Sequence, residues 1–210
     1  MKTVSIIPVK SFIKAKTRLS LSTENTVELC KLMLDEVLET ISSSTRIDST
    51  IIVSQDESAF HIAKKFNVIE IFDELESGVN NAISIADKYI SNSDFDTSII
   101  FPQDIPFFNC DDIENLFSFY QKDKSVVIVP SRHFNGTNAL IRKPATLIET
   151  RYDEGTYKSH LRQGSINEIN FSLVLIQRLM LDIDTPNDLQ YAVRHNVKPE
   201  LCRKILDLIE

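Results

Sequence analysis

The chain has 210 residues, enough for one domain with a sizeable core, and its 42% hydrophobic and 25% charged residues are ordinary values for a globular protein. With 23 basic and 30 acidic residues, the net charge of −7 argues against nucleic acid or an anionic membrane surface as the main partner. No apolar run approaches the length that crosses a bilayer, and the amino terminus shows no signal region. Three widely spaced cysteines show neither a metal-binding spacing nor a disulfide framework, so we expect a cytoplasmic protein.

The glycines of the chain rule out two common nucleotide-binding motifs. Only four occur, at Gly78, Gly136, Gly155 and Gly164, and neither G-x-G-x-x-G nor G-x-x-x-x-G-K-[ST] can be written with them. The usual dinucleotide-binding turn and the P-loop of many kinases are therefore excluded.

Short apolar runs alternate with amphipathic segments along the whole chain. The runs predict strands at Val4–Val9, Thr50–Ser54, Val68–Phe72, Ile99–Phe101, Val126–Val129, Ala139–Ile141 and Leu179–Asp184. Helices are expected after Ser22 or Thr23, over Ala59–Phe66, up to about Tyr89, over about Asp111–Tyr120, near Gly155 and from Pro186. This alternation indicates βαβ units, so we expect a single α/β domain over residues 1–210 with a mixed, mostly parallel central sheet.

The loop after the first strand carries four positive charges and no acidic residue. Its charges are Lys10, Lys14, Lys16 and Arg18. A charged run of this kind is often a solvated surface segment, but this one directly follows the first strand and so lies at the carboxyl edge of the sheet. Arg binds phosphate oxygens in a bidentate manner and Lys acts as a point charge, so the loop is a candidate phosphate site.

A polar segment opens the helix that ends near Tyr89. It contains Gly78, Asn80 and Asn81. These residues fit a turn and a helix cap, and the asparagines equally fit a contact to a base or a ribose.

A buried apolar run leads to a lone carboxylate in the middle of the chain. Ile99–Phe101 predicts a central strand, and Asp104 follows between Pro102 and Pro106, which make the exit loop stiff. Open α/β sheets bind ligands just past the carboxyl ends of their strands. Asp104 is therefore a candidate metal ligand, although an Asp between two prolines is also typical of a turn cap.

Two more carboxylates lie close together near the carboxyl terminus. In the expected strand Leu179–Asp184, Asp182 and Asp184 would point to the same side, because alternate residues of a strand share a face. Two like charges on one face repel each other, and a cation relieves this repulsion. One of them could instead cap the helix that begins at Pro186, but a single cap does not explain two acids.

These groups together suit nucleotidyl transfer. Two carboxylates from separate strands would hold Mg²⁺ opposite a cationic loop, and the metal would clamp the α-phosphate of a nucleotide. Lys and Arg would neutralise the charge that develops on pyrophosphate. The attacking group would be a phosphate, which is already ionised, so the reaction needs no general base. The sequence shows no obvious Ser/His/Asp or Cys/His set, in agreement with this chemistry.

Five motifs in the same order resemble those of the 2-phospho-L-lactate guanylyltransferases, the CofC and FbiD proteins. The motifs are Ile7–Lys10 with Ala15–Ser20, Gly78–Ala82, Asp104–Pro106, Gly136–Leu140 and Leu181–Leu189. Each is weak by itself, but their order over nearly the whole chain is specific.

The resemblance implies a Rossmann-like, nucleotide-diphospho-sugar-transferase (GT-A-like) fold and a Mg²⁺-dependent reaction. In this reaction GTP and 2-phospho-L-lactate, or phosphoenolpyruvate in some members, give a guanosine diphosphate ester and pyrophosphate on the route to coenzyme F-420. Carried over by position, the resemblance assigns the nucleotide to Lys10, Lys16, Arg18 and Asn80, catalysis to Lys16, Arg18 and Asp104, the metal to Asp104, Asp184 and Asp182, and the acceptor to Thr137, Asp153 and Thr156. Nucleic acid and membrane are not expected as partners, and a homodimer is compatible with the sequence.

One departure from the family leaves the acceptor open. The family has an aromatic-Gly-x-x-Ser run before a helix that ends in His, whereas this chain has Tyr152, Asp153 and Thr156 before His160. Thr156 keeps a hydroxyl, but Asp153 adds negative charge where an anionic substrate is expected. A nucleotidyltransferase for another acceptor, such as phosphoglycerate or a sugar phosphate, and a non-catalytic nucleotide-binding domain are therefore the alternatives. His160 is either a packing residue or a ligand, and no residue decides between guanine and another base.

Overall fold

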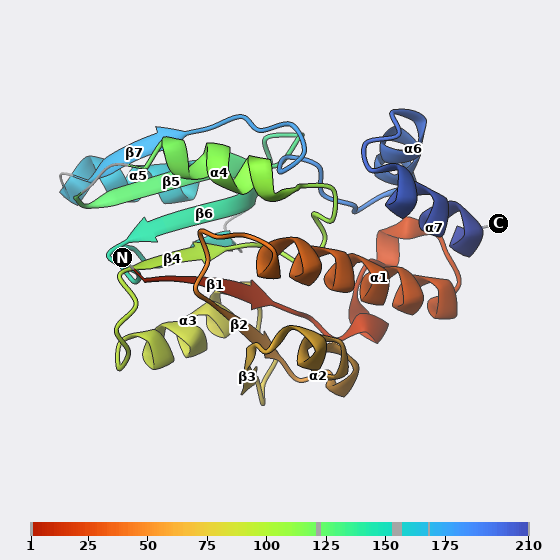
Figure 1. Cartoon of the computed structure of the whole chain (residues 1–210), viewed down its shortest axis with the longest axis horizontal. Helices are drawn as coiled ribbons and strands as arrows, with labels where there is room; N and C mark the ends of the chain where they lie inside the picture. The colour runs from red at the N-terminus through yellow and green to blue at the C-terminus, as the bar shows by residue number, and fades with distance from the viewer. Residues whose placement is uncertain (1, 121–122, 153–156, 168, 210) are drawn as a thin grey trace.

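A seven-stranded mixed sheet forms the centre of the molecule (Figure 1). The computed structural model describes residues 2–120, 123–152, 157–167 and 169–209. The strands are β1 (Thr3–Pro8), β2 (Ser49–Ser54), β3 (Ile69–Phe72), β4 (Thr97–Ile100), β5 (Ser125–Pro130), β6 (Thr137–Lys143) and β7 (Asn170–Leu173). Their order across the sheet is β3-β2-β1-β4-β6-β5-β7, and only β6 runs antiparallel to its neighbours among the described strands. The predicted mixed, mostly parallel α/β sheet is confirmed.

Helices cover both faces of this sheet. One face packs against α1 (Thr23–Ser42), α2 (Glu57–Ala63), α4 (Cys110–Ser118), α6 (Pro186–Arg194) and α7 (Pro199–Ile209). The other face packs against α3 (Val79–Ile90) and α5 (Tyr157–Asn167). Short 3₁₀ turns complete the description: η1 (Phe12–Lys14), η2 (Thr17–Leu19) and η3 (Lys64–Phe66). Because β1 is covered on both sides, all six of its residues are buried, which explains why it is mostly apolar and not an alternation of apolar and charged residues.

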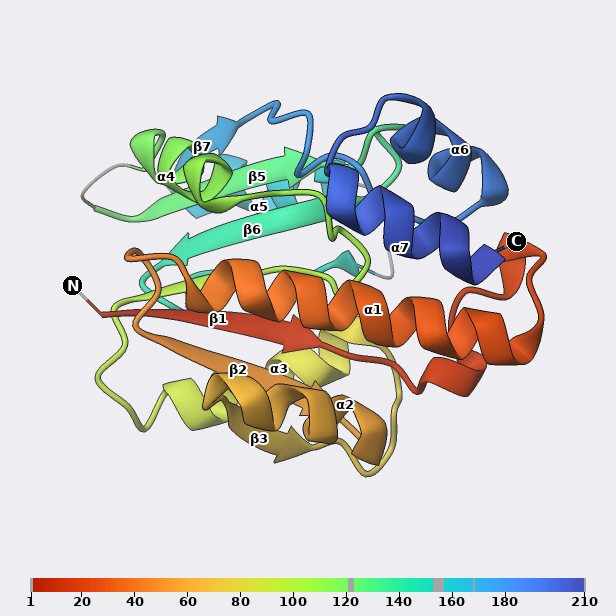
Figure 2. The ribbon, with the colours of Figure 1, turned by 45° about the vertical axis from the view of Figure 1, so that its right-hand side comes forward.

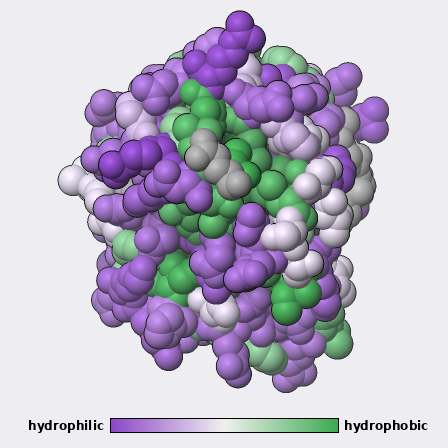
Figure 3. Space-filling view, turned by 90° about the vertical axis from the view of Figure 1, so that its right-hand side faces the viewer, coloured by the Kyte–Doolittle hydropathy of each residue, from purple (hydrophilic) through white to green (hydrophobic). Residues whose placement is uncertain are grey.

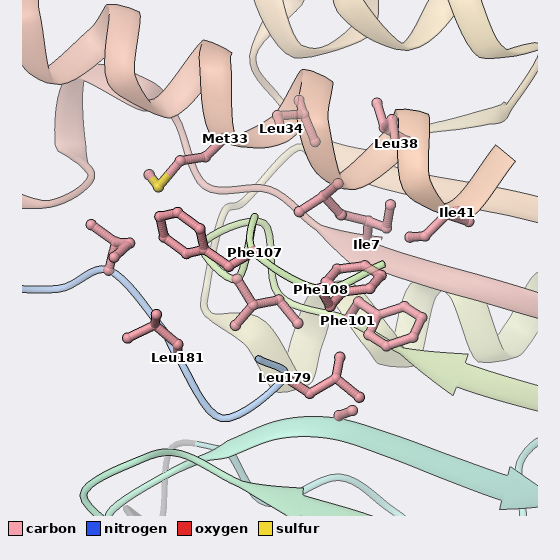
Figure 4. Packing of buried hydrophobic residues seen from close by; sticks show 14 of the residues in the cluster. Ile7, Met33, Leu34, Leu38, Ile41, Phe101, Phe107, Phe108, Leu179 and Leu181 are labelled. Atoms are coloured by element: carbon pink, nitrogen blue, oxygen red, sulfur yellow. The ribbon is translucent and has the colours of Figure 1, made fainter. Parts of the chain in front are cut away.

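Helix α1 runs along β1 in both ribbon views and carries the larger core (Figure 2). Ser22 begins it, and the Ser22 hydroxyl accepts a hydrogen bond from the Asn25 amide at 3.1 Å. The helix buries apolar side chains at helical spacing, among them Met33, Leu34 and Leu38. These side chains face a group of aromatic rings that follow β4 (Figure 4), namely Phe101, Phe107 and Phe108. The rigid α1 core thus fixes the segment that carries Asp104.

The prediction of a last strand at Leu179–Asp184 is wrong. Residues 177–180 form a turn, and residues 181–184 belong to no strand of the sheet. The reason lies in the sheet, because β4 is already paired with β1 on one side and β6 on the other. The segment crosses the end of β4 instead, where the Ile183 amide donates a hydrogen bond to the Asp104 carbonyl at 2.9 Å. The sequence interpretation also missed β7, an edge strand with no fully buried residue, and α7.

No helix in the described part of the chain is long and apolar enough to cross a membrane.

A buried arginine joins α3 to the sheet. Arg142 on β6 is 0% exposed, and its guanidinium donates to both carboxylate oxygens of Asp87 on α3, at 2.6 and 2.8 Å. Its Nε also donates to the Ser98 hydroxyl at 3.0 Å, and Nη1 donates to the Ile148 carbonyl at 3.1 Å. The Arg142 guanidinium is fully buried, so the folded state is stable only if the Asp87 carboxylate pairs with this charge.

We predict that Asp87→Ala lowers the free energy of unfolding by about 3 kcal/mol, because it leaves the Arg142 charge buried without its partner. The matched control is Asp35→Ala, which also removes a helical aspartate but breaks only the exposed pair with Lys65. That control should cost less than about 1 kcal/mol. Urea denaturation of both variants measures the two values, and equal losses would contradict the role assigned to the buried pair.

Candidate active site

A cavity of about 470 Å³ lies at the carboxyl ends of β1 and β4. It is lined by the loop after β1, the start of α3, the segment after β4 and Asp184. Five of the predicted site residues, Lys10, Lys16, Arg18, Asp104 and Asp184, therefore meet at one place. The volume is within the range of about 300–1,000 Å³ that is common for small-molecule sites. Figure 3 shows the side of the molecule toward which β1 points, with apolar side chains at the centre and hydrophilic ones around them.

The loop after β1 is held by its apolar residues, so its cations are free to line the cavity. Phe12, Ala15 and Leu19 are buried, and the Phe12 amide donates to the Asp56 carboxylate at 2.9 Å. Lys16 adopts a left-handed backbone conformation with φ of 54°, which turns the chain between η1 and η2. The loop is therefore a built structure and not a solvated surface run.

Lys16 lies between two of the three predicted metal ligands, Asp104 and Asp184. Its ammonium contacts the Asp104 carboxylate and donates to Asp184 Oδ1 at 2.5 Å, and its side chain is only 8% exposed. Arg18 donates to the other oxygen of Asp184 at 2.7 Å from the exposed side. Burial lowers the pKa of Lys16, but the charges of Asp104 and Asp184 outweigh burial and raise the pKa above its ordinary value. The structure thus places a positive charge where the sequence predicts a cation.

Asp182 lies close enough to Asp104 and Asp184 to be affected by their charges, but it does not line the cavity. Its carboxylate accepts a hydrogen bond from the Asn138 amide nitrogen at 3.2 Å. Burial, and then the negative charges of Asp104 and Asp184, raise the pKa of Asp182. Asp182 and Asp184 are therefore close enough to interact although they belong to no strand. Metal binding by these carboxylates stays a prediction, and the described residues contain no group of three or more metal-ligating His, Cys, Asp or Glu side chains.

Neither Asp182 nor Asp184 caps the following helix. Thr185 begins α6, and its amide and its hydroxyl both donate to Asp188 Oδ2, at 2.8 and 2.7 Å. Arg132 donates to the other oxygen of Asp188 at 2.7 Å. This reciprocal cap leaves Asp184 available to face Lys16 and Arg18, which settles the alternative that the sequence left open for it.

The predicted nucleoside residue Asn80 and the predicted acceptor residue Thr137 do not line the cavity. The Asn80 side-chain oxygen accepts from the Tyr152 amide at 2.9 Å, and Asn80 does not line the cavity. Thr137 is buried, with its hydroxyl 3.1 Å from His160 Nδ1. Asp153 and Thr156 lie outside the described residues. The roles of all four in substrate binding stay predictions.

His160 acts as a packing residue between β6 and the segment that leads to α5. It is fully buried, and its ring meets the Tyr152 ring edge-on at 5.1 Å. The Arg151 amide donates to His160 Nε2 at 2.9 Å, so the ring proton is on Nδ1 and is donated to the Thr137 hydroxyl.

Polar residues that the sequence interpretation did not assign to the site also line the cavity, among them Asp73, Glu76 and Gln103. The Glu76 carboxylate binds the Ser11 amide, Lys14 and Gln55, and these contacts outweigh burial and lower the pKa of Glu76. The Gln103 side-chain oxygen is buried and makes no hydrogen bond to any residue that the structure describes. Two features of the sequence could have identified these residues: the acidic residues just before Gly78, and the position of Gln103 directly before Asp104.

Comparison with known sequences fits this geometry. Residues 3–201 match the profile of the family described as "Guanylyl transferase CofC like". The chain belongs to this family. A relative of this CofC-like protein from Methanobrevibacter smithii, named 2-phospho-L-lactate guanylyltransferase, is 32% identical over 205 residues, covering 97% of this chain and 89% of the relative. A relative from Sphaerobacter thermophilus, named phosphoenolpyruvate guanylyltransferase, is 27% identical over 197 residues, covering 93% and 94%. The family resemblance predicted from the motifs is confirmed.

Solved structures show that the CofC-like chain has the expected fold. A nucleotide-diphospho-sugar transferase from Desulfovibrio desulfuricans G20 superposes with a TM-score of 0.75 at 16% identity, over 100% of this chain and 97% of that one. A nucleotidyl transferase from a Methanothermobacter species gives a TM-score of 0.66 at 11% identity, over 97% and 99%. At these identities the likeness establishes the fold alone, and it confirms the predicted GT-A-like class.

We predict that Thr137→Val lowers the free energy of unfolding by about 1–2 kcal/mol, because it removes the hydroxyl to which His160 Nδ1–H donates at this buried position. Thr137→Ser keeps the hydroxyl and should retain most of the stability. Thermal denaturation of the two variants compares them, and an equally stable Thr137→Val protein would show that the Thr137–His160 hydrogen bond has no structural role.

Proposed function

We propose that this CofC-like protein transfers GMP from GTP to 2-phospho-L-lactate or phosphoenolpyruvate, with release of pyrophosphate, in the biosynthesis of coenzyme F-420. The observation that carries the proposal is the convergence of Asp104 and Asp184 on one cation, Lys16, inside a cavity with further positive charges. Membership of the family and the names of both relatives support it. Cytoplasmic location and a homodimer remain predictions.

The two carboxylates fit a Mg²⁺ ion. Both already surround one cation, and Asp182 adds a further negative charge nearby. Mg²⁺ is commonly held by one or two carboxylates together with substrate phosphates and water, so two protein ligands are sufficient. When bound between Asp104 and Asp184, the ion would polarise the α-phosphate and neutralise charge in the transition state.

The basic residues of the cavity would bind the triphosphate. Lys10 and Arg18 are exposed on the loop after β1, and Lys16 lies deeper, beside Asp104. Their positive charges would stabilise the pyrophosphate leaving group as its charge develops. Among the described residues the cavity lining contains no His or Cys, and an ionised acceptor phosphate needs neither as a base. The protein therefore acts mainly by positioning and electrostatics.

The sheet order would place the two substrates on opposite sides of Asp104. Asp104 follows β4, with β1, β2 and β3 on one side and β6 on the other. The cavity extends from β4 toward Asp73 and Gly78, on the β3 side, and this part would hold the nucleoside. The acceptor would lie on the β6 side, near Thr137, with Asp153 and Thr156 as its predicted further contacts.

The decisive experiment measures pyrophosphate release by purified protein with Mg²⁺ and GTP. The acceptors 2-phospho-L-lactate, phosphoenolpyruvate and phosphoglycerate are added one at a time, and ATP and CTP replace GTP in parallel. We expect release with GTP and one of the first two acceptors. Release only with phosphoglycerate would favour another acceptor, and no release with any pair would contradict the proposed activity.

We predict that Asp104→Asn and Asp184→Asn each reduce turnover by at least about a hundredfold, because each removes a charge that holds Lys16 and the proposed metal. Asp111→Asn, at an exposed position on α4, is the control and should retain full activity. Chelation of divalent ions should abolish activity of the unmodified protein, and added Mg²⁺ should restore it. Activity that survives either substitution or chelation would exclude the metal role.

A further inference from the structure

Lys16 contacts both carboxylates at the place where the proposed cation would bind. Its ammonium has three N–H donors, of which one is directed to Asp104 and another to Asp184. The side chain is 8% exposed, so the charge is enclosed between its two partners. A divalent cation between the same oxygens would lie next to this ammonium and would be repelled by it.

We infer that Lys16 fills the cation position between Asp104 and Asp184 until a nucleotide binds, so that divalent metal and nucleotide bind cooperatively. The inference rests on the proposed function and adds to it an order of events at the same site. Lys16 is then a positioning residue with two successive partners, first the carboxylates and later the phosphates.

The nucleotide provides the second partner. A buried ammonium that leaves two carboxylates needs new negative charge, and the triphosphate supplies it within the same cavity. The Lys16 side chain is long and flexible, whereas the apolar residues beside it, Ala15 and Leu19, keep the backbone of the loop in place. Transfer of Lys16 to the phosphates frees Asp104 and Asp184 for the metal. Because binding is linked, bound metal must strengthen nucleotide binding by the same factor.

The chain offers two matched controls for this inference. Lys14 is in the same loop and lines the same cavity, but its ammonium pairs with Glu76 and not with the two aspartates. Lys14→Gln therefore removes an equal charge without emptying the cation position. Lys16→Arg keeps the charge at the position itself.

The test is a titration of the nucleotide-free protein with Mn²⁺, with free Mn²⁺ measured by electron paramagnetic resonance. We expect Lys16→Gln to bind Mn²⁺ at least about fivefold more tightly than the unmodified protein. Lys14→Gln and Lys16→Arg should bind it as the unmodified protein does. Adding Asp184→Asn to Lys16→Gln should abolish the gain, which shows that the ion is at this site. Thermal denaturation checks that each variant is folded.

A second measurement tests the coupling itself. Binding of the α,β-methylene analogue of GTP, which cannot be cleaved at the reacting bond, is compared with Mn²⁺ and with chelator. In the unmodified protein Mn²⁺ should strengthen binding of the analogue at least about fivefold. In Lys16→Gln this factor should be smaller, because no ammonium has to be displaced and only the direct contact of the ion with the phosphates remains, and the overall affinity for the analogue should decrease.

The outcomes separate this inference from the proposed function. Equal Mn²⁺ affinity of Lys16→Gln and the unmodified protein would overturn the inference even if pyrophosphate is released. Tighter Mn²⁺ binding by both Lys16→Gln and Lys14→Gln would also overturn it, because the effect would then come from net charge. Failure of the unmodified protein to release pyrophosphate with any acceptor would overturn the proposed function, whatever the Mn²⁺ titrations give.

Discussion

Three carboxylates lie close together beyond the end of β4, and neighbouring cations and an amide group compensate for their negative charge. Asp104, Asp182 and Asp184 lie close enough to affect one another, and such a group is stable only next to positive charge or with protons bound. The loop after β1 brings Lys16 and Arg18 to this place, and Asn138 on β6 supplies an amide. Four separate parts of the chain therefore meet around these three carboxylates.

The backbone also contributes to this arrangement. The crossing segment reaches Asp104 through one amide-to-carbonyl hydrogen bond, from Ile183, and the cap of α6 is made by Thr185 and Asp188. Because Asp188 accepts the hydrogen bonds of Thr185 at the start of α6, Asp184 is not needed for this cap. Two aspartates four residues apart thus have different roles: Asp188 caps the amino end of α6, and Asp184 faces the cavity.

The sequence predicted most of the sheet, because buried strands such as β1 and β4 contain short apolar runs and no charged residue. It failed for residues 179–184, since an apolar alternation does not tell whether β4 still has a free edge to pair with. It also missed β7, which is half-exposed and lacks such a run. For the candidate site, charge and position were enough to predict that Lys16, Arg18, Asp104 and Asp184 lie at one edge of the sheet, where they line one cavity. Glu76 and Gln103 were missed because their position in the cavity depends on contacts between segments far apart in the sequence, which no local pattern shows.

The order of the chain separates the sheet from the site. The last strand of the sheet ends at Leu173, whereas Asp184 follows it and is placed by a segment that leads into α6 and α7. During synthesis all the described strands therefore leave the ribosome before the second carboxylate does. A chain cut between Leu173 and Leu181 would keep every described strand and lose half of the cation position. In this architecture the described sheet and the candidate site are therefore completed at different chain lengths.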